Sequence, residues 1–306
     1  MSETAPRLVA KAHYDWLGMD CPLLRTGAGQ PLLLVHGFGA CGLHWRHQLG
    51  ALGRDHLVLA PDLVGFGDAP MPQPTRGRPY RFADWADQMA TLLRTEAHTP
   101  VWVVGHSIGA LVALELALQH PDAVRGVIAI NPSLRQLHRR RQRGLATVTV
   151  PLAMALLAWR PLVAGLLRFT RHPPRLRHLL LRAYPSGRHL DNALVDMLAA
   201  PARRPGAVAV LQSFGRYDHG PLPEDQLRRC RRPVHLIWGA ADPWESVDRG
   251  RELSRFGCVR SWHSVEGLGH CPHDEGPEQI NPLLLRCMDS TDDAGCRDQP
   301  VEGEAA

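Results

Sequence analysis

The 306-residue sequence predicts an α/β protein that has a mostly parallel β-sheet, helices on both faces of the sheet and a helical segment inserted late in the chain. Three observations support this prediction. Short apolar runs rich in β-branched residues alternate with helical stretches, which is typical of a covered parallel sheet. A glycine-flanked serine joins one of these runs to a strong helix. About a hundred residues separate two of the runs, far more than a crossover needs.

Six apolar runs are expected to form strands. They occupy residues 31–37, 56–62, 101–107, 124–131, 234–240 and 259–266. Residues 1–133 and 231–288 therefore supply the two parts of the core. Residues 134–230 supply the insertion, which we expect to be a helical cap. Residues 289–306 are acidic, small and polar, which predicts a disordered tail.

Cysteine usage and the first residues favour an intracellular protein. The seven cysteines are Cys21, Cys41, Cys230, Cys258, Cys271, Cys287 and Cys296. They are scattered and show no CxxC spacing, which fits a reducing compartment. The first sixteen residues lack the apolar core of a signal peptide and the character of a transit peptide. We therefore expect a cytoplasmic location.

The positive charge of the chain belongs to the insertion. Lys11 is the only lysine among 35 basic residues. Between Leu134 and Tyr184 there are eleven arginines and no acidic residue, whereas the rest of the chain has more acidic than basic residues. Nucleic acid is not an expected partner, because aromatic residues for base stacking are sparse in this segment.

Residues 144–159 form an uncharged stretch inside the same segment. Its sixteen residues are fewer than the roughly 20 that span a bilayer, so we expect cap helices and no transmembrane span. Two interpretations stay open. Either the stretch packs over the active site and the arginines are a solvated face, or the segment is a basic, apolar surface that lies peripherally on an anionic membrane.

The most informative stretch, residues 101–121, contains Ser107. This serine lies between Gly105 and Gly109, where an apolar strand meets a helix. A serine at such a sharp turn takes a strained backbone conformation, so the two glycines relieve crowding around it. The helix N-terminus favours the negative charge that develops in acyl transfer. Ser107 is therefore the predicted nucleophile.

These features resemble the α/β-hydrolase family over residues 30 to 285. The resemblance implies the α/β-hydrolase fold. It also implies that the cap is inserted after the sixth core strand of that fold, which corresponds here to residues 124–131. The chain order in the family is nucleophile, acid and histidine. The resemblance therefore implies Asp242 as the acid and His270, 28 residues later, as the general base. It also implies that the backbone N–H groups of Phe38 and Ile108 form the oxyanion hole.

Alternatives exist for two of these positions. Glu245 is the second candidate for the acid, and the site after the preceding core strand, which some family members use, carries Asn131. His106 and His273 are the alternatives to His270 as the base.

Three stretches, residues 36–70, 238–245 and 269–282, resemble a chloroplast and cyanobacterial branch of the family that includes pheophytinase and chlorophyll dephytylase. Those enzymes remove the phytyl alcohol from chlorophyll pigments. The resemblance implies a small apolar carboxylic ester as the substrate, perhydrolysis or a general esterase or lipase activity being the alternatives. Pheophytinase has Asn where this chain has His106, and the cap is the least similar region.

Parts of the sequence are compatible with three other classes of protein. Residues 37–42 satisfy GxGxxG, and Asp62 follows twenty residues later, which is the fingerprint of a dinucleotide site. His270, Cys271, His273 and Cys258 could supply metal ligands, but no second spaced pair completes a set. A non-catalytic binding protein of the same fold is the third class. We expect no cofactor and no metal, because only the serine hydrolase explains all the motifs together.

Overall fold

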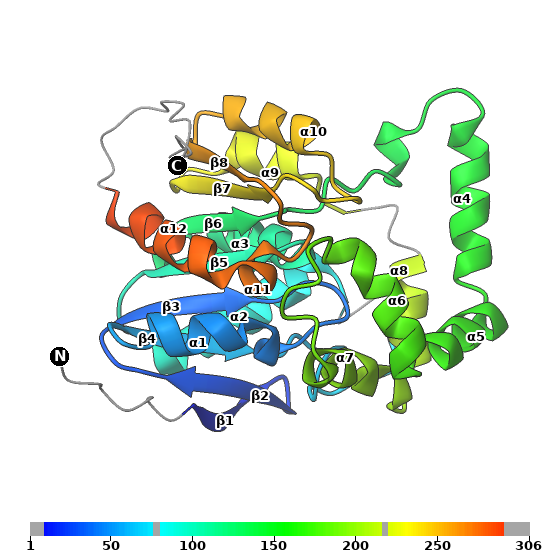
Figure 1. Ribbon diagram of the computed structural model, residues 1–306, viewed down its shortest axis with the longest axis horizontal. Helices are drawn as coiled ribbons and strands as arrows, with labels where there is room; N and C mark the ends of the chain where they lie inside the picture. Colours follow the sequence, from blue (N-terminus) through cyan, green and yellow to red (C-terminus); the bar gives the residue numbers. More distant parts are fainter. Residues whose placement is uncertain (1–8, 76–79, 216–219, 291–306) are drawn as a thin grey trace.

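A computed structural model of the chain describes residues 9–75, 80–215 and 220–290. Its centre is one eight-stranded sheet with the order β1-β2-β4-β3-β5-β6-β7-β8 (Figure 1). The strands are β1 (Ala10–Trp16), β2 (Met19–Thr26), β3 (Gln30–Val35), β4 (His56–Pro61), β5 (Val101–His106), β6 (Val124–Ile130), β7 (Val234–Gly239) and β8 (Val259–Val265). All pairs from β4 to β8 are parallel, which confirms the predicted fold class.

The six predicted strands are present, but the N-terminal hairpin of β1 and β2 was not predicted. β1 and β2 pair antiparallel, and β2 also pairs antiparallel with β4 at the sheet edge. In β1 only alternate residues, Tyr14 and Trp16, are buried. Because one face of this hairpin is exposed, its residues form no continuous apolar run.

Helices cover both faces of the sheet. One face carries α2 (Phe82–Glu96), α3 (Ile108–Gln119) and α9 (Pro223–Arg229), whose apolar side chains share one core cluster. The other face carries α1 (Arg46–Leu52) and α12 (Pro277–Asp289), which build a second cluster. Two short helices, α10 (Val247–Arg251) and α11 (Pro272–Glu275), follow β7 and β8. The central strands are thus buried on both sides, as a parallel sheet requires.

Five helices form the cap between β6 and the second part of the core. They are α4 (Ala146–Leu157), α5 (Arg160–Thr170), α6 (Pro173–Ala183), α7 (Asn192–Ala199) and α8 (Ala207–Gly215). In Figure 1 they lie to one side of the sheet, and α4 and α5 stand farthest from it. Among the described helices none is long and apolar enough to cross a membrane alone. α4 and α5 meet that test only as a pair, bent by 70°.

The predicted cap range, residues 134–230, includes one helix that packs on the core. α9 lies inside the predicted range but packs on α3, and the Gln226 side chain donates a hydrogen bond to the Leu111 carbonyl (3.0 Å). α9 therefore belongs to the core. At the other end of the chain α12 runs to Asp289, so the first residue of the predicted tail is helical, and residues 291–306 lie outside the described residues.

The packing of α3 on β3 makes a prediction about stability. A Cβ atom at Gly109 would lie 2.3 Å from the carbonyl oxygen of Val35 and 2.5 Å from that of His36. Because these are backbone atoms, they cannot turn away. We predict that Gly109→Ala lowers the free energy of unfolding by about 1–3 kcal/mol, measured by urea unfolding.

Gly165→Ala is the matched control, because Gly165 is also helical, in α5, and its Cβ would meet nothing within 4 Å. This variant is expected to raise the free energy of unfolding by about 0.5–1 kcal/mol, since alanine favours helix. Equal effects of the two substitutions would contradict the packing argument.

Candidate active site

Ser107 sits at the junction of β5 and α3 with a strained backbone. Its φ is 55° and its ψ is −117°, a region that a residue with a side chain rarely adopts. The turn is tight, because a Cβ at Gly105 would lie 2.4 Å from the Gly109 carbonyl oxygen. The Ser107 N–H donates to the Ile130 carbonyl in β6 (3.0 Å). The predicted glycine-flanked turn is therefore present and anchored to the neighbouring strand.

Asp242 and His270 meet across the ends of β7 and β8. The distance from His270 Nδ1 to Asp242 Oδ2 is 2.7 Å, and the Asp242 side chain is fully buried. The other carboxylate oxygen accepts the N–H groups of Trp244 (2.8 Å) and Glu245 (3.1 Å). Burial alone would raise the pKa of Asp242, but the His270 contact and these N–H groups outweigh it and hold the pKa below its ordinary value. Asp242 is thus a charged, fixed acceptor for His270.

Asn131 holds this acid in place, a role that the sequence analysis missed. Its Nδ2 donates to Asp242 Oδ2 (2.7 Å), and its Oδ1 accepts the Gly239 N–H (3.0 Å). Asn131 has a positive φ of 41°, which asparagine tolerates better than most residues. The residue that occupies the alternative acid position therefore supports the acid on the next strand.

Glu245, the second candidate acid, faces a different partner. Its Oε1 accepts the hydroxyl of Ser133 (3.0 Å), and no hydrogen bond joins it to His270 in the described residues. Burial raises the pKa of Glu245 above its ordinary value. Of the two carboxylates, Asp242 is the one that orients His270.

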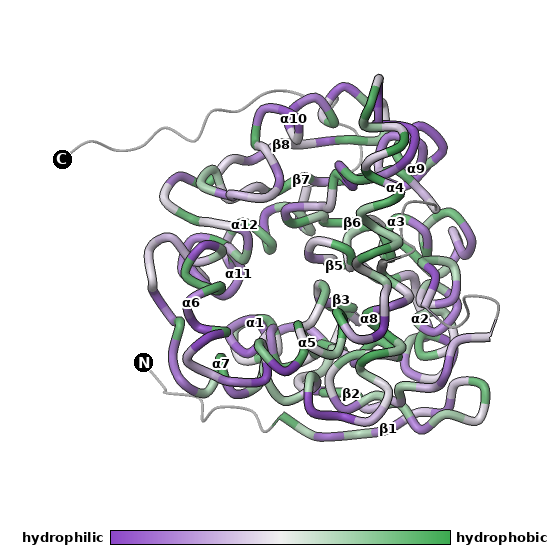
Figure 2. Tube along the Cα trace, turned by 90° about the vertical axis from the view of Figure 1, so that its right-hand side faces the viewer, coloured by the Kyte–Doolittle hydropathy of each residue, from purple (hydrophilic) through white to green (hydrophobic). Residues whose placement is uncertain are grey.

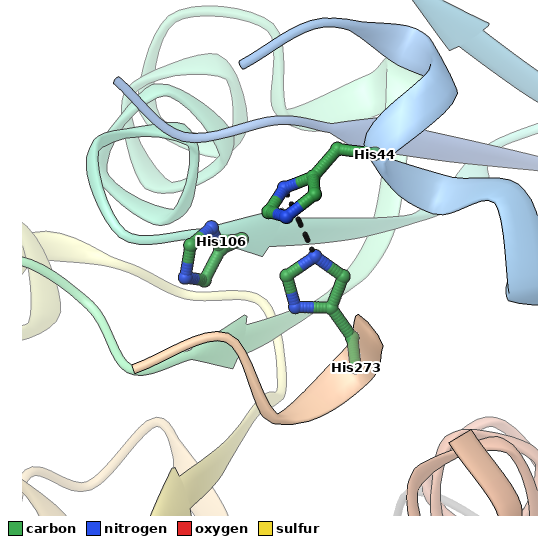
Figure 3. A group of neighbouring side chains, drawn as sticks. All are labelled: His44, His106 and His273. Atoms are coloured by element: carbon green, nitrogen blue, oxygen red, sulfur yellow. Dashed lines mark hydrogen bonds between the residues drawn. The ribbon is translucent and has the colours of Figure 1, made fainter. Parts of the chain in front are cut away.

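The two alternative bases, His106 and His273, belong to a buried cluster with His44 (Figure 3). His106 Nε2 lies 2.8 Å from the carbonyl oxygen of His270, and His273 Nε2 lies 3.3 Å from His44 Nδ1. His44 Nε2 in turn contacts the hydroxyl of Tyr184 (2.9 Å), which donates to the Asp274 carboxylate (3.1 Å).

With neutral rings, which burial favours, these contacts fix the tautomers. His106 Nε2 donates to a carbonyl. The Tyr184 hydroxyl gives its proton to Asp274 and so accepts from His44 Nε2, which leaves His44 Nδ1 to accept from His273 Nε2. Burial lowers the pKa of His44 to about 4 and places the pKa values of His106 and His273 well below the ordinary value. The cluster is a hydrogen-bonded support for the His270 loop.

The same three histidines form a group that could hold a metal ion by the distances between their ligand atoms. Their ligand atoms lie within 4.8 Å of one another. Both nitrogens of His44 already have hydrogen-bond partners, so ligation would break that chain. The ligand set weighed from the sequence is not assembled, because the Cys258 thiol donates to the Leu227 carbonyl (3.1 Å) instead. The cluster therefore fits a structural role better than a metal site.

The segments that carry the predicted oxyanion donors lie next to Ser107. Gly37 lies against Ser107 and His106, since a Cβ added there would be 3.2 Å from Ser107 Cβ. Phe38 is the next residue. Ile108 is the first residue of α3, where backbone N–H groups have no partner inside the helix. The oxyanion role of the Phe38 and Ile108 N–H groups stays a prediction.

The dinucleotide alternative is wrong. Asp62 does not present an open carboxylate, because its oxygens accept the N–H groups of Gly42 and Asp68, both at 2.7 Å. The Asp62 residue is 8% exposed. A ribose cannot bind the Asp62 carboxylate, because both of its oxygens already accept hydrogen bonds from the backbone of two loops.

An apolar cavity of about 270 Å³ lies between the cap and the core beside Phe38. Its walls come from the core loops (Phe38, Gly39, Gly65, Phe66, Met71) and from the cap (Leu166, Leu167, Thr170, Leu176, Leu180, Leu198, Pro201, Ala202, Ala207, Val210, Leu211). Nearly all of these side chains are hydrocarbon. The cavity therefore suits an apolar group of a ligand whose polar part reaches the Phe38 loop.

Comparisons with known proteins identify the family of the chain. A model of the alpha/beta hydrolase family matches residues 32–283. The chain is 25% identical to the chloroplastic pheophytinase of Arabidopsis thaliana, over 98% of this chain and 68% of that protein. It is 30% identical to the magnesium-chelatase 30 kDa subunit of Rhodobacter capsulatus, over 89% of this chain and 90% of that protein.

Solved structures show the same fold. The epoxide hydrolase CorEH matches with a TM-score of 0.76 and 20% identity, covering 92% of this chain and 99% of that one. CarC, a serine hydrolase involved in carbazole degradation, matches with a TM-score of 0.72 and 19% identity, covering 92% and 99%. At these identities the likeness concerns the fold.

The neutral imidazoles predict acid sensitivity. An unfolded histidine has a pKa of about 6.5, so unfolding at lower pH takes up protons that the folded cluster does not bind, and stability falls below about pH 6.5. We predict that His106→Asn removes about one proton from this uptake. The slope of unfolding free energy against pH would then fall by about 1.4 kcal/mol per pH unit between about pH 5.5 and 4.5.

The measurement is urea unfolding at a series of pH values. The exposed histidine His98 supplies the control, since His98→Asn should leave the slope as it is in the wild type. An unchanged slope in His106→Asn would show that its ring is not neutral in the folded protein.

Proposed function

Since the chain belongs to the alpha/beta hydrolase family, we propose that it is a serine hydrolase that cleaves a carboxylic ester of an apolar substrate through an acyl-enzyme. The observation that carries the proposal is the contact of 2.7 Å between His270 Nδ1 and the buried Asp242 carboxylate. Asp242 accepts the Nδ1 proton, so Nε2 of the neutral ring is left as the proton acceptor.

The reaction follows from these roles. The Ser107 hydroxyl oxygen attacks the ester carbonyl while His270 Nε2 takes its proton, and the N–H groups of Phe38 and Ile108 stabilise the oxyanion. Collapse of the tetrahedral intermediate breaks the bond to the alcohol, which leaves with the proton from His270. Water then attacks the acyl group by the same route, releasing the acid and restoring Ser107. Each proton that His270 accepts is returned in the same half-reaction.

The cavity and one relative support the same class of substrate. The cavity beside Phe38 is lined almost wholly by apolar side chains, which favours an ester with a long hydrocarbon group. The relative named pheophytinase aligns over 98% of this chain. We therefore propose a phytyl-type ester of a chlorophyll or pheophytin pigment as the substrate class, with simple long-chain esters as weaker substrates.

We predict that Ser107→Ala and His270→Ala each lower ester turnover by roughly 10³-fold or more, because each removes a group that acts in the bond-breaking step. Asp242→Asn is expected to lose roughly 10³-fold, because the amide presents the wrong hydrogen-bonding group to His270. Turnover of a chromogenic ester and covalent labelling by a fluorophosphonate probe are the measurements.

Two variants control this experiment. Ser254→Ala changes a serine on the short helix Glu252–Arg255 and should label and turn over as the wild type does. Glu245→Gln should keep activity within about tenfold, because Glu245 bonds Ser133 and not His270. Near-normal turnover by Ser107→Ala would refute Ser107 as the nucleophile. A greater loss of turnover from Glu245→Gln than from Asp242→Asn would show that Glu245, and not Asp242, is the acid.

One relative favours a second candidate function. The Rhodobacter capsulatus protein is named as a subunit of magnesium chelatase, so this chain could bind a pigment within a larger assembly without cleaving an ester. A wild-type protein that binds pheophytin but resists the fluorophosphonate probe would favour this candidate. Labelling at Ser107 would favour the hydrolase.

Cavity filling tests the substrate class. Ala202 lines the cavity from the short helix Ala200–Arg203. We predict that Ala202→Trp raises KM for pheophytin or a long-chain ester by about tenfold and changes KM for an acetyl ester little, since the indole occupies the place of the hydrocarbon. Ala200→Trp is the matched control, because Ala200 is exposed and does not line the cavity. Equal effects on both esters would show that the cavity does not hold the long group.

A further inference from the structure

α4 presents a continuous apolar face to solvent. The exposed fraction is 59–80% for three residues of α4 (Val148, Leu152 and Leu156) and for Leu145 and Trp159, which lie just before and just after it. The spacing of four residues from Val148 to Leu152 and Leu156 places these three on one side of the helix. Figure 2, which views the molecule from the side where α4 lies, shows hydrophobic colour along this segment. This apolar face therefore has no protein partner in the part of the chain that the structure describes.

This apolar face is bounded by arginines. No charged residue lies in residues 144–159, whereas Arg143 precedes α4 and Arg160 follows it. Further exposed arginines lie on or beside α5 and α6 (Arg168, Arg171, Arg175, Arg177 and Arg182). Within the part of the chain that the structure describes, Arg143 and Arg160 form no ion pair. Their charges are available to an anionic partner.

The exposed face continues to the cavity beside the proposed oxyanion loop. On α5, Leu162, Leu166 and Phe169 are 40–46% exposed. Leu166 also lines the cavity, as does Phe38 of the proposed oxyanion loop. Hydrocarbon surface thus extends from solvent, across α5, to the cavity that this loop lines.

The arginines near α4 favour an anionic bilayer over a second copy of this chain as the surface that covers the helix. A second copy of this chain would bring one set of arginines against another, since residues 134–184 carry no acidic side chain. An anionic bilayer supplies both hydrocarbon for the apolar face and phosphate for the arginines. α4 is shorter than a membrane span, so it would lie along the interface.

We propose that the apolar face of α4 and the adjoining part of α5 dock on an anionic lipid surface, with Arg143 and Arg160 at the level of the phosphates. Resting on the proposed function, this placement gives an ester dissolved in the bilayer a hydrocarbon route along α5 to the cavity.

The test is flotation of the full-length protein with phosphatidylcholine vesicles that contain or lack phosphatidylglycerol. The wild type should float with the anionic vesicles at low salt, and the bound fraction should fall when phosphatidylglycerol is omitted or salt is raised. Leu152→Glu with Leu156→Glu should lower vesicle affinity roughly tenfold or more. Arg143→Gln with Arg160→Gln should lower it roughly tenfold.

Matched controls lie outside the cap. Leu17, in the turn between β1 and β2, is 67% exposed, close to the 70% of Leu152, so Leu17→Glu adds a negative charge at similar exposure, and Arg54→Gln removes an exposed arginine. Both should float as the wild type does. A soluble short-chain ester should be turned over equally by all of these variants, so that loss of vesicle binding is separated from loss of catalysis.

Three results would overturn the proposal. The first is no flotation of the wild type at low salt. The second is flotation of the Leu152→Glu, Leu156→Glu double variant to the same extent as the wild type. The third is a wild type that is dimeric in light scattering and a double variant that is monomeric, with neither protein bound to vesicles. Absence of ester turnover with normal flotation would instead count against the proposed function and leave the docking surface standing.

Discussion

The strained backbone of Ser107 is the constraint on which the rest of the site depends. Its conformation is possible because Gly105 and Gly109 have no side chains, and it is held by the bond from its N–H to Ile130. β3, β5, β6 and β7 are parallel, so their carboxyl ends meet at one edge of the sheet. That edge gathers the proposed nucleophile, oxyanion loop and acid.

A second layer of buried polar groups supports this edge from behind. The imidazoles of His44, His106 and His273 connect the oxyanion loop, the nucleophile turn and the His270 loop, and Tyr184 joins them to the cap. Keeping three rings neutral favours a fixed geometry near neutral pH and costs stability in acid. Arg46 adds a charged tie between the buried Asp274 and Asp191 of the cap.

What could be predicted from the sequence was local. The buried strands form continuous apolar runs, and the nucleophile turn needs glycines at fixed positions around Ser107, so both are visible in short windows. The contacts of Asn131 with Asp242 and of His44 with Tyr184 join residues 111 and 140 positions apart, and no local pattern signals them. The orientation of α4 could not be predicted either. The sequence pattern of an apolar helix is the same whether its exposed face packs on a protein core or on lipid.

The central claim is that acyl transfer passes through Ser107. Its most direct measurement is mass spectrometry of the protein quenched during turnover of a long-chain ester, followed by mapping of the modified peptide. The account predicts an acyl adduct on Ser107 in the wild type and none in Ser107→Ala. An adduct on another residue, or full turnover by Ser107→Ala, would contradict it.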